Sequence, residues 1–538
     1  MFKGHPKGLI AAALANMGER FGFYTMMAIL ALFIQAKFGL DGENTGYIYS
    51  TFYALIYVLS LVGGIIADKT GKYKGTIMTG LVVMSLGYFL MAIPTNVTSD
   101  NKTLFLIMTL AALFIIAFGN GLFKGNLQAL VGQMYDNPKY EKMRDSGFSL
   151  FYMFINVGAI FAPFTAVGVR NWWLGKHGFE YNANLPALCH QQIDGTIEAT
   201  KVVGTGALDK AQAGVERLFS LDPTNQFQQL AKTVSDSGVV NNLKDFASEY
   251  LNVFVTGFHY AFAVAIIAMG ISFLVWILNK KFFPNPKSSK ERKDAIANSD
   301  APVMDIKEVK QRMYALFAVF GVVIFFWFSF HQNGLTLTFF AKDYTDLSSM
   351  VVTIFGVKIE GAELFQSMNP FFVVFLTPII VGVFGWLRNK GIEPSTPRKI
   401  AIGMGIASTA FVIMAIGSMG LPDFATINPK AGGTPLDDAL KVTPFLLMGT
   451  YLVLTIAELF ISPLGISFVS KVAPPQYQGL MQGLWLGATA AGNQLLFIGA
   501  ILYESVPIWM TWSVFVGATA LSMFMMLFMV KWLERITN

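Results

Sequence analysis

Five ionisable side chains lie inside long apolar runs of this chain, and their chemistry is the first clue to its function. They are Glu19, Arg20, Lys124, His331 and Glu458. A charged side chain at the centre of a lipid bilayer costs about 2.5–3.5 kcal/mol, so such a group is expected to face a partner or a water-filled cavity. Carboxylates and histidine can exchange protons, and cations can bind a carboxylate. The set therefore indicates a shared polar cavity that recognises charge and takes up protons.

The stretch NMGERFGFY, residues 16–24, holds the first two of these groups. Residues three and four positions apart lie on the same face of a helix. That spacing places the following side chains on one polar and aromatic face: Asn16, Glu19, Arg20, Phe23, Tyr24 and Met27. The other side of this helix is Ala, Leu, Met and Ile. We expect a helix that turns one stripe toward a cavity.

The composition identifies the solvent around these runs. The chain has 538 residues, of which 54% are hydrophobic and 13% charged, whereas average soluble chains carry roughly 25% charged residues. Many apolar runs are long enough to cross about 30 Å of hydrocarbon as a helix. The sequence thus predicts an all-α polytopic membrane protein whose surroundings are a lipid bilayer. The alternating pattern of a β-barrel is absent.

Twelve membrane-spanning helices are expected. They cover residues 8–36, 46–67, 76–94, 103–134, 146–169, 254–279, 313–341, 366–388, 399–419, 443–470, 476–503 and 508–532. Lys and Arg gather in the loops on the side of both termini, which the positive-inside rule places in the cytoplasm. This loop distribution, rather than nucleic-acid binding, explains the net charge of +6. We expect a location in the plasma (inner) membrane.

Two long connections divide the chain. Residues 1–169 form the first five helices of an N-terminal half, and 254–279 form its sixth. Residues 170–253 form an extracytoplasmic insert, with helix-like stretches at 209–221 and 225–234. Residues 280–312 form a basic cytoplasmic linker before the six-helix C-terminal half, 313–538. Six spans plus six suggest two pseudo-symmetric halves.

One loop motif supports this arrangement. The segment GGIIADKTGKYKG, residues 63–75, resembles the Gly, Asp-Arg/Lys and Gly-Arg/Lys pattern between the second and third helices of major facilitator transporters. A glycine there allows neighbouring helices to approach closely. The resemblance implies the major facilitator fold, with twelve transmembrane helices in two halves.

Further motifs resemble those of the proton-dependent oligopeptide transporter (POT/PTR) family. NMGERFGFY is similar to the family's first-helix motif, Glu-x-x-Glu-Arg-Phe-x-Tyr-Tyr. Other family-like stretches follow in order: GNGLFKGNLQALVGQMY (119–135), DSGFSLFYMFINVGA (145–159), FFWFSFHQNG (325–334), QSMNPFF (366–372) and TIAELFISPLGISFVSKVAPPQYQGLMQGLW (455–485). The resemblance covers the membrane part and leaves out the 170–253 insert.

The resemblance implies a binding site for short peptides between the halves. Glu458 would hold the peptide's ammonium group, helped by Asn156 and Asn369. A charge pair in a low-dielectric cavity is stronger than in water. Lys124 and Arg20 are the cations available for the peptide's carboxylate. Four aromatic residues would line side-chain pockets: Tyr24, Tyr57, Trp327 and Trp485.

Three positions depart from the family's pattern. Asn16 replaces the first glutamate of the first-helix motif, His331 replaces the usual acid before Gln332, and Met27 replaces a frequent arginine. Two carboxylates linked to proton coupling are therefore missing. The remaining candidates for proton coupling are Glu19, with its partners Arg20 and Lys124, His331 and Glu458; pairing and histidine chemistry set their proton affinity.

The sequence therefore predicts a monomeric secondary active transporter that carries di- and tripeptides with protons by alternating access. An alternative is a related carrier of nitrate, another anion or a peptide-like metabolite, without tight proton coupling. An enzyme is not expected, because the chain lacks His-Glu-x-x-His, Gly-x-Ser-x-Gly and a phosphate-binding Gly-x-x-x-x-Gly-Lys-Ser/Thr loop. No cofactor is expected, and one cysteine, Cys189, offers no Cys-rich metal site.

Overall fold

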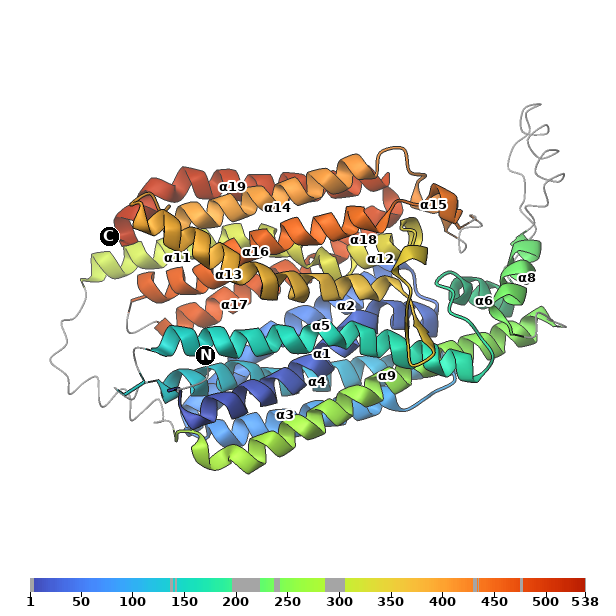
Figure 1. The fold of residues 1–538 in the computed structure, drawn as a ribbon, viewed down its shortest axis with the longest axis horizontal. Coiled ribbons are helices and arrows are strands. Elements are labelled where there is room, and N and C mark those ends of the chain that lie inside the picture. The colour runs from blue at the N-terminus through green and yellow to red at the C-terminus, as the bar shows by residue number, and fades with distance from the viewer. Residues whose placement is uncertain are drawn as a thin grey trace.

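Long helices lie side by side in a single bundle (Figure 1). The computed structural model describes residues 4–135, 139–140, 143–195, 223–236, 242–285, 305–428, 433, 435–474 and 478–537. Among these residues, twelve helical segments have the length and apolar composition needed to cross a membrane. The predicted all-α polytopic architecture with twelve spans is confirmed.

The first half contains six long helices. They are α1 (Lys7–Phe38), α2 (Gly42–Thr70), α3 (Tyr73–Ala92), α4 (Lys102–Met134), α5 (Arg144–Lys176) and α9 (Leu243–Asn279). Because α5 runs to Lys176 and α9 starts at Leu243, both helices extend into the segment that we assigned to the insert. Two shorter helices lie between them, α6 (Leu185–Asp194) and α8 (Pro223–Val234). The helix-like stretch 225–234 falls in α8, and 209–221 lies outside the described residues.

The second half contains six spans, two of which are interrupted. The seventh consists of α11 (Ile306–Phe330), the 3-10 turn η3 (His331–Gly334) and α12 (Thr336–Tyr344), and the eleventh of α17 (Gln478–Gln494) and α18 (Leu496–Ser505). The others are η5 (Ala362–Ser367) with α13 (Met368–Asn389), α14 (Thr396–Gly417), α16 (Pro444–Val472) and α19 (Ile508–Thr537).

Short elements connect these spans. Strands β1 (Val352–Ile354) and β2 (Val357–Ile359) form an antiparallel hairpin between α12 and η5. The remaining pieces are α15 (Phe424–Ile427) and the 3-10 turns η2 (Lys280–Phe282), η4 (Ser348–Met350) and η7 (Asp438–Leu440).

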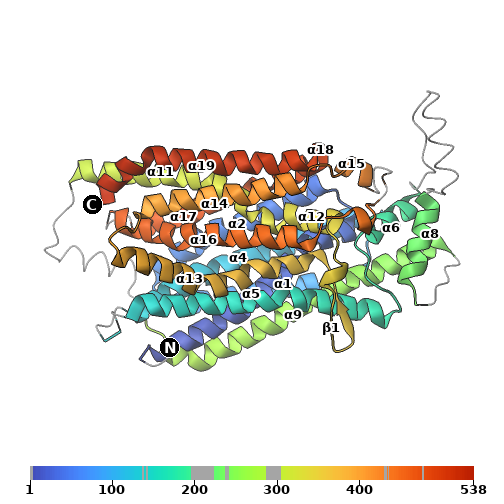
Figure 2. The same ribbon diagram turned by 45° about the horizontal axis from the view of Figure 1, so that its top comes forward.

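The bundle has two distinct ends (Figures 1 and 2). Both chain termini lie at one of them, which we call the terminal end. Helices α6, α8 and α15 lie at the opposite end, which we call the insert end. The β1–β2 hairpin also lies toward the insert end, where it runs across the direction of the long helices (Figure 2).

Glycines allow close contact between α2 and α4. A Cβ atom on Gly63 would overlap the backbone carbonyl of Gly121, and one on Gly121 would overlap the backbone of Leu59. The side chain of Asn126 donates a hydrogen bond of 3.0 Å to the carbonyl oxygen of Gly63. Within a membrane, such close backbone packing and interhelical hydrogen bonds replace the hydrophobic driving force. The glycine of the 63–75 motif that makes the close contact is Gly63; around Gly64, a Cβ atom would meet nothing within 4 Å.

We predict that Gly63→Ala destabilises the protein and that Gly64→Ala does not. The added methyl group of Gly63→Ala must push α2 from α4, and overpacking of this kind costs about 1–3 kcal/mol. Thermal unfolding in detergent should show a lower midpoint for Gly63→Ala and a midpoint near wild type for Gly64→Ala. Equal midpoints for the two variants would contradict the close contact.

Candidate functional site

A cavity of about 240 Å³ lies between the two halves. Residues of α1, α2, α4 and α5 form the wall from the first half, and residues of α11, η3, η5, α13, α16 and α17 form the wall from the second. Ten of the eleven predicted site residues line it: Arg20, Tyr24, Tyr57, Lys124, Asn156, Trp327, His331, Asn369, Glu458 and Trp485. Their convergence agrees with the prediction of a shared polar cavity.

Glu19 lies outside the cavity lining, behind Arg20. Its carboxylate accepts hydrogen bonds from Arg20 Nε at 2.5 Å and from Arg20 Nη2 at 2.7 Å. The side-chain amide of Asn120 donates a further hydrogen bond of 2.8 Å to Glu19 Oε1. Both members of the pair are buried. Glu19 therefore neutralises Arg20, whose guanidinium still reaches the cavity.

Lys124 has no ion-pair partner among the residues that the structure describes. Its ammonium lies 4.3 Å from the centre of the Tyr57 ring, a cation–π contact that depends on the negative face of the ring. Within the described part of the chain, no carboxylate lies within ion-pair distance of Lys124. We predicted that Glu19 exchanges between Arg20 and Lys124, and this structure holds the arrangement in which Glu19 binds Arg20.

Glu458 is a carboxylate with neutral partners only. Its Oε2 accepts a hydrogen bond of 2.8 Å from Asn369 Nδ2, which also lies 3.1 Å from Thr455 Oγ1. Among the residues described, no cation lies within ion-pair distance of Glu458. Asn156 faces it from the other half as a cavity residue, with its own amide donating to the carbonyl of Tyr152 at 3.1 Å.

His331 begins the 3-10 turn that interrupts the seventh span. Its Nδ1 lies 2.5 Å from Oδ1 of the buried Asn493. Because an amide oxygen only accepts hydrogen bonds, Nδ1 is the donor, and Nε2 of the neutral ring is left as an acceptor. The imidazole lies between two aromatic rings, stacked on Trp327 at a centroid distance of 4.9 Å and tilted against Tyr53 at 4.9 Å. These contacts hold the ring in one orientation at the cavity wall.

Gln332 connects the interruptions of the seventh and eleventh spans. Its Nε2 donates hydrogen bonds of 3.3 Å to the carbonyl oxygens of Phe328 and Leu496, and its Oε1 accepts one of 2.6 Å from Thr336. Buried backbone carbonyls left without partners are costly in a membrane. One buried amide thus joins the end of α11 to the start of α18.

Several cavity residues were missed. Tyr49 and Tyr53 precede Tyr57 at steps of four residues on α2, and all three line the cavity. The four-residue spacing of these tyrosines is visible in the sequence, but only Tyr57 was predicted as a site residue. Gln366 and Ser462 also line the cavity; both lie in the family-like stretches 366–372 and 455–485, which was the signal that could have identified them. Asn16, placed on the polar face of the first helix, is buried away from the cavity lining.

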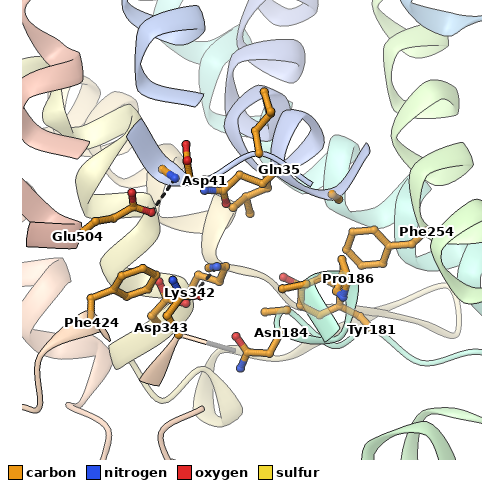
Figure 3. A pocket seen from close by; sticks show the side chains of 17 residues that line it. Gln35, Asp41, Tyr181, Asn184, Pro186, Phe254, Lys342, Asp343, Phe424 and Glu504 are labelled. Carbon is orange, nitrogen blue, oxygen red and sulfur yellow. Dashed lines mark hydrogen bonds and ion pairs between the residues drawn. The ribbon is translucent and has the colours of Figure 1, made fainter. Parts of the chain in front are cut away.

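Charged and polar contacts join the halves at the insert end. The Glu504 carboxylate, on α18, accepts hydrogen bonds of 2.7 Å and 3.2 Å from the backbone N–H groups of Gly42 and Glu43, where α2 begins. A helix N-terminus has free N–H groups and a partial positive charge, so a carboxylate stabilises it. This contact lies beside a small pocket of about 60 Å³ that also holds the Lys342–Asp343 ion pair (Figure 3).

A buried ion pair forms the second contact between halves. Arg170 of α5 donates a hydrogen bond to the carboxylate of Glu363 in η5, and both side chains are fully buried. Arg170 also donates to the carbonyl of Glu360 at 3.1 Å, and its guanidinium lies 4.0 Å from the Tyr181 ring centre. The cavity is therefore closed on its flanks at the insert end, by α18 against α2 and by η5 against α5.

Twelve spans in two halves around a polar cavity define a membrane carrier with the major facilitator architecture. The chain belongs to the POT family, whose model matches residues 74–189 and 287–509. The predicted family and fold are thereby confirmed, and so is the expectation that the protein is a multi-pass transporter rather than an enzyme.

Curated relatives match over most of their length. The peptide transporter YePEPT of Yersinia enterocolitica is 28% identical over 91% of this chain and 87% of its own. The dipeptide and tripeptide permease A of Escherichia coli is 25% identical over 91% of this chain and 82% of its own.

Solved structures share the fold over the whole chain. A crystal structure of a peptide transporter POT in complex with sulfate gives a TM-score of 0.67 at 21% identity, covering 100% of this chain and 96% of that one. A POT family transporter in complex with a thioalcohol-conjugated peptide gives 0.67 at 20% identity, with coverage of 100% and 98%.

We predict that Gln332→Leu impairs both stability and transport. The substitution leaves the carbonyls of Phe328 and Leu496 without its amide donor, and each unsatisfied buried polar group costs about 1–3 kcal/mol. The thermal midpoint in detergent and the rate of substrate uptake should both fall. The control is Gln482→Leu, which removes an exposed amide on α17 bonded to the Ile466 carbonyl. Equal effects of the two substitutions would argue against the role of Gln332.

Proposed function

We propose that this protein is a symporter that carries di- and tripeptides with protons by alternating access. The main support is the pair of charges that remain without ionic partners in the described cavity wall. Lys124 belongs to the first half and Glu458 to the second. A short peptide is a zwitterion, with an ammonium at one end and a carboxylate at the other. One free cation and one free carboxylate facing a common cavity complement it.

The roles follow from this complementarity. Glu458 receives the peptide's ammonium, with Asn369 and Asn156 as neutral hydrogen-bonding neighbours. Lys124 receives the carboxylate, with Arg20 next to it. The aromatic side chains of Tyr24, Tyr57, Trp327 and Trp485 contact the peptide's side chains. The volume of about 240 Å³ lies below the range of about 300–1,000 Å³ typical of sites for drug-sized ligands, which favours small substrates.

Proton coupling is proposed to use the same groups. Glu458 exchanges a proton for the ammonium of the substrate, since a buried carboxylate is more stable when neutral or paired. Protonation of Glu19 weakens its ion pair with Arg20, and the Arg20 guanidinium can then bind the substrate. His331 offers an acceptor nitrogen at the cavity wall and can take a proton there.

The alternative substrate, nitrate or another anion, rests on Asn16, Met27 and His331. The free carboxylate of Glu458 counts against it, because a lone anion gains nothing from that group and is repelled by it. A peptide-like metabolite that carries both an ammonium and a carboxylate fits the same two charges.

We further propose that the protein is a monomer in the plasma (inner) membrane with both termini in the cytoplasm, as the loop charges indicate. The domain division follows from this orientation: an N-terminal half, an extracytoplasmic insert, a cytoplasmic linker and a C-terminal half. The insert end is then the outer end, and the contacts of Glu504 with α2 and of Arg170 with Glu363 close the cavity toward the outside.

Uptake of a labelled dialanine-type peptide into proteoliposomes tests the function. With an inward proton gradient the peptide should accumulate above its equilibrium level, and without the gradient it should only equilibrate. Glu458→Gln should reduce peptide affinity at least about tenfold, because a charge-paired group is worth about 1.5–3 kcal/mol and about 1.4 kcal/mol corresponds to a factor of ten.

The outcomes of this assay distinguish proton-coupled peptide transport from uncoupled peptide transport and from anion transport. Equilibration alone, with or without the gradient, would contradict proton coupling and leave peptide transport intact. Nitrate uptake that peptides do not compete with would overturn the peptide proposal. A suitable control is Thr489→Ser, which keeps a hydroxyl at another cavity position.

The proposed closure of the cavity by the Arg170–Glu363 ion pair gives a second prediction. Glu363→Gln leaves Arg170 buried without its counter-charge, and breaking a buried ion pair in this way costs about 3–5 kcal/mol. The closed state should lose population to a state open at the insert end. Spin labels at Asp100 and Met419, which are exposed residues of opposite halves at that end, should report a longer distance.

The matched control for this prediction is Glu360→Gln. Glu360 contacts Arg170 through its backbone carbonyl, so the same chemical change leaves that hydrogen bond in place. The distance distribution should then resemble that of the parent protein. If Glu363→Gln leaves the distribution unchanged as well, the ion pair does not hold the outer end closed.

A further inference from the structure

The β1–β2 hairpin has one apolar and one polar face. Side chains of paired residues in an antiparallel hairpin point to the same side, and successive residues alternate. The pairs Val352–Ile359 and Ile354–Val357 therefore share one face, and the pair Thr353–Lys358 lies on the other. On the polar face, Lys358 forms an ion pair of 2.6 Å with Glu180. On the apolar face, Val352 and Ile354 are exposed.

An aromatic residue occupies the tip of this hairpin. Phe355 and Gly356 form its two-residue turn, with φ angles of 50° and 78°. Turns with two positive φ angles favour Asn and Gly, and a bulky residue there is unusual. The side chain of Phe355 is fully exposed. A large apolar group at a position unfavourable to it calls for an apolar environment around the tip.

The depth of the hairpin follows from the helix that comes after it. Apolar side chains are exposed along α13 at steps of four residues, at Phe371, Phe375 and Ile379, as expected of a lipid-facing stripe. Trp386 is exposed near the end of α13 that lies at the terminal end of the bundle. The ammonium of Lys390 lies 4.0 Å from the centre of the Trp386 ring. Tryptophan beside a basic residue is typical of the membrane–water interface.

The position of this membrane–water interface gives the position of the opposite one, because the hydrocarbon has a known thickness. Between Trp386 and Met368 the helix rises about 27 Å at about 1.5 Å per residue, close to the hydrocarbon thickness of about 30 Å. The opposite edge of the hydrocarbon therefore lies near η5, which directly follows the hairpin. The exposed Trp172 of α5, with Lys176 5.9 Å from its ring centre, lies at the same level as the hairpin, because the neighbouring Asn171 donates to the Lys358 carbonyl at 2.9 Å.

We propose that the β1–β2 hairpin is a membrane anchor that lies on the lipid surface at the insert end, with Val352 and Ile354 toward the acyl chains and Phe355 inserted among them. Figure 2 supports this placement, since the hairpin crosses the direction of the spans and its turn projects past α5. The polar face, with Thr353 and Lys358, remains toward water.

The anchor belongs to the second half and rests on the first. Ile359 packs against Val167 and Phe164 of α5 and against Leu364. Asn171 holds the carbonyls of Lys358 and Glu360. Lipid binding by the hairpin would therefore keep η5, with Glu363, beside α5.

Fluorescence quenching tests the depth of each face. The native cysteine, Cys189, is buried and can be replaced by alanine. Single cysteines are then introduced as Thr353→Cys, Ile354→Cys and Phe355→Cys and labelled with an environment-sensitive NBD probe. The full chain is reconstituted into phosphatidylcholine vesicles with or without a nitroxide near the acyl–headgroup boundary. Iodide on both sides of the membrane serves as the aqueous quencher.

The expected result is several-fold stronger nitroxide quenching at positions 354 and 355 than at 353, with the opposite order for iodide. Thr353 is the matched control, because it is exposed, adjacent and on the polar face. Equal iodide quenching at all three positions would overturn the anchor. Stronger nitroxide quenching at 353 than at 354 would overturn the assigned faces. The measurement needs no transport activity, so its failure is separate from a failure of the proposed function.

Discussion

Hydrocarbon does not solvate charge, and the polar architecture of this protein follows from that constraint. Two buried ion pairs among the described residues are neutral as pairs: Glu19–Arg20, whose guanidinium reaches the cavity, and Arg170–Glu363. Among the described residues of the cavity wall, Lys124 and Glu458 are charged groups without an ionic partner, and they face a common cavity. A bilayer accepts this arrangement because water or substrate reaches these two groups. The charges that are expensive in lipid are thus the ones that a zwitterionic substrate can neutralise.

Side-chain hydrogen bonds add to the backbone hydrogen bonds at the helix interruptions of the seventh and eleventh spans. Gln332 satisfies carbonyls of both α11 and α18, and the hydroxyl of Tyr451 donates to the Asn333 carbonyl at 2.7 Å. A segment held through side-chain hydrogen bonds bends more readily than a continuous helix. Helices α12 and α18 lie beyond these points, and α18 carries Glu504 to the start of α2. Bending at the interruption between α17 and α18 would therefore move Glu504 relative to α2.

Local patterns predicted the fold and most of the cavity, and long-range packing decided the rest. Apolar run length and loop charge indicated twelve spans, and the family's motifs located ten cavity residues, because both signals are contained in short segments. Asn16 lies one turn before Arg20, the first residue of α1 in the cavity lining, and helical spacing does not report where along a helix a cavity ends. The Arg170–Glu363 pair joins residues 193 positions apart, and Arg170 lay in a segment that we assigned to the insert. No periodicity reports such a contact.

Two of the contacts between the halves at the insert end join different pairs of elements. Glu504 joins α18 to α2, whereas Glu363 joins η5 to α5. Opening at this end separates both contacts, which leaves the buried Arg170 without its counter-charge and the N-terminus of α2 without its carboxylate. Lipid binding by the proposed anchor would favour the state in which η5 lies beside α5, because the hairpin directly precedes η5.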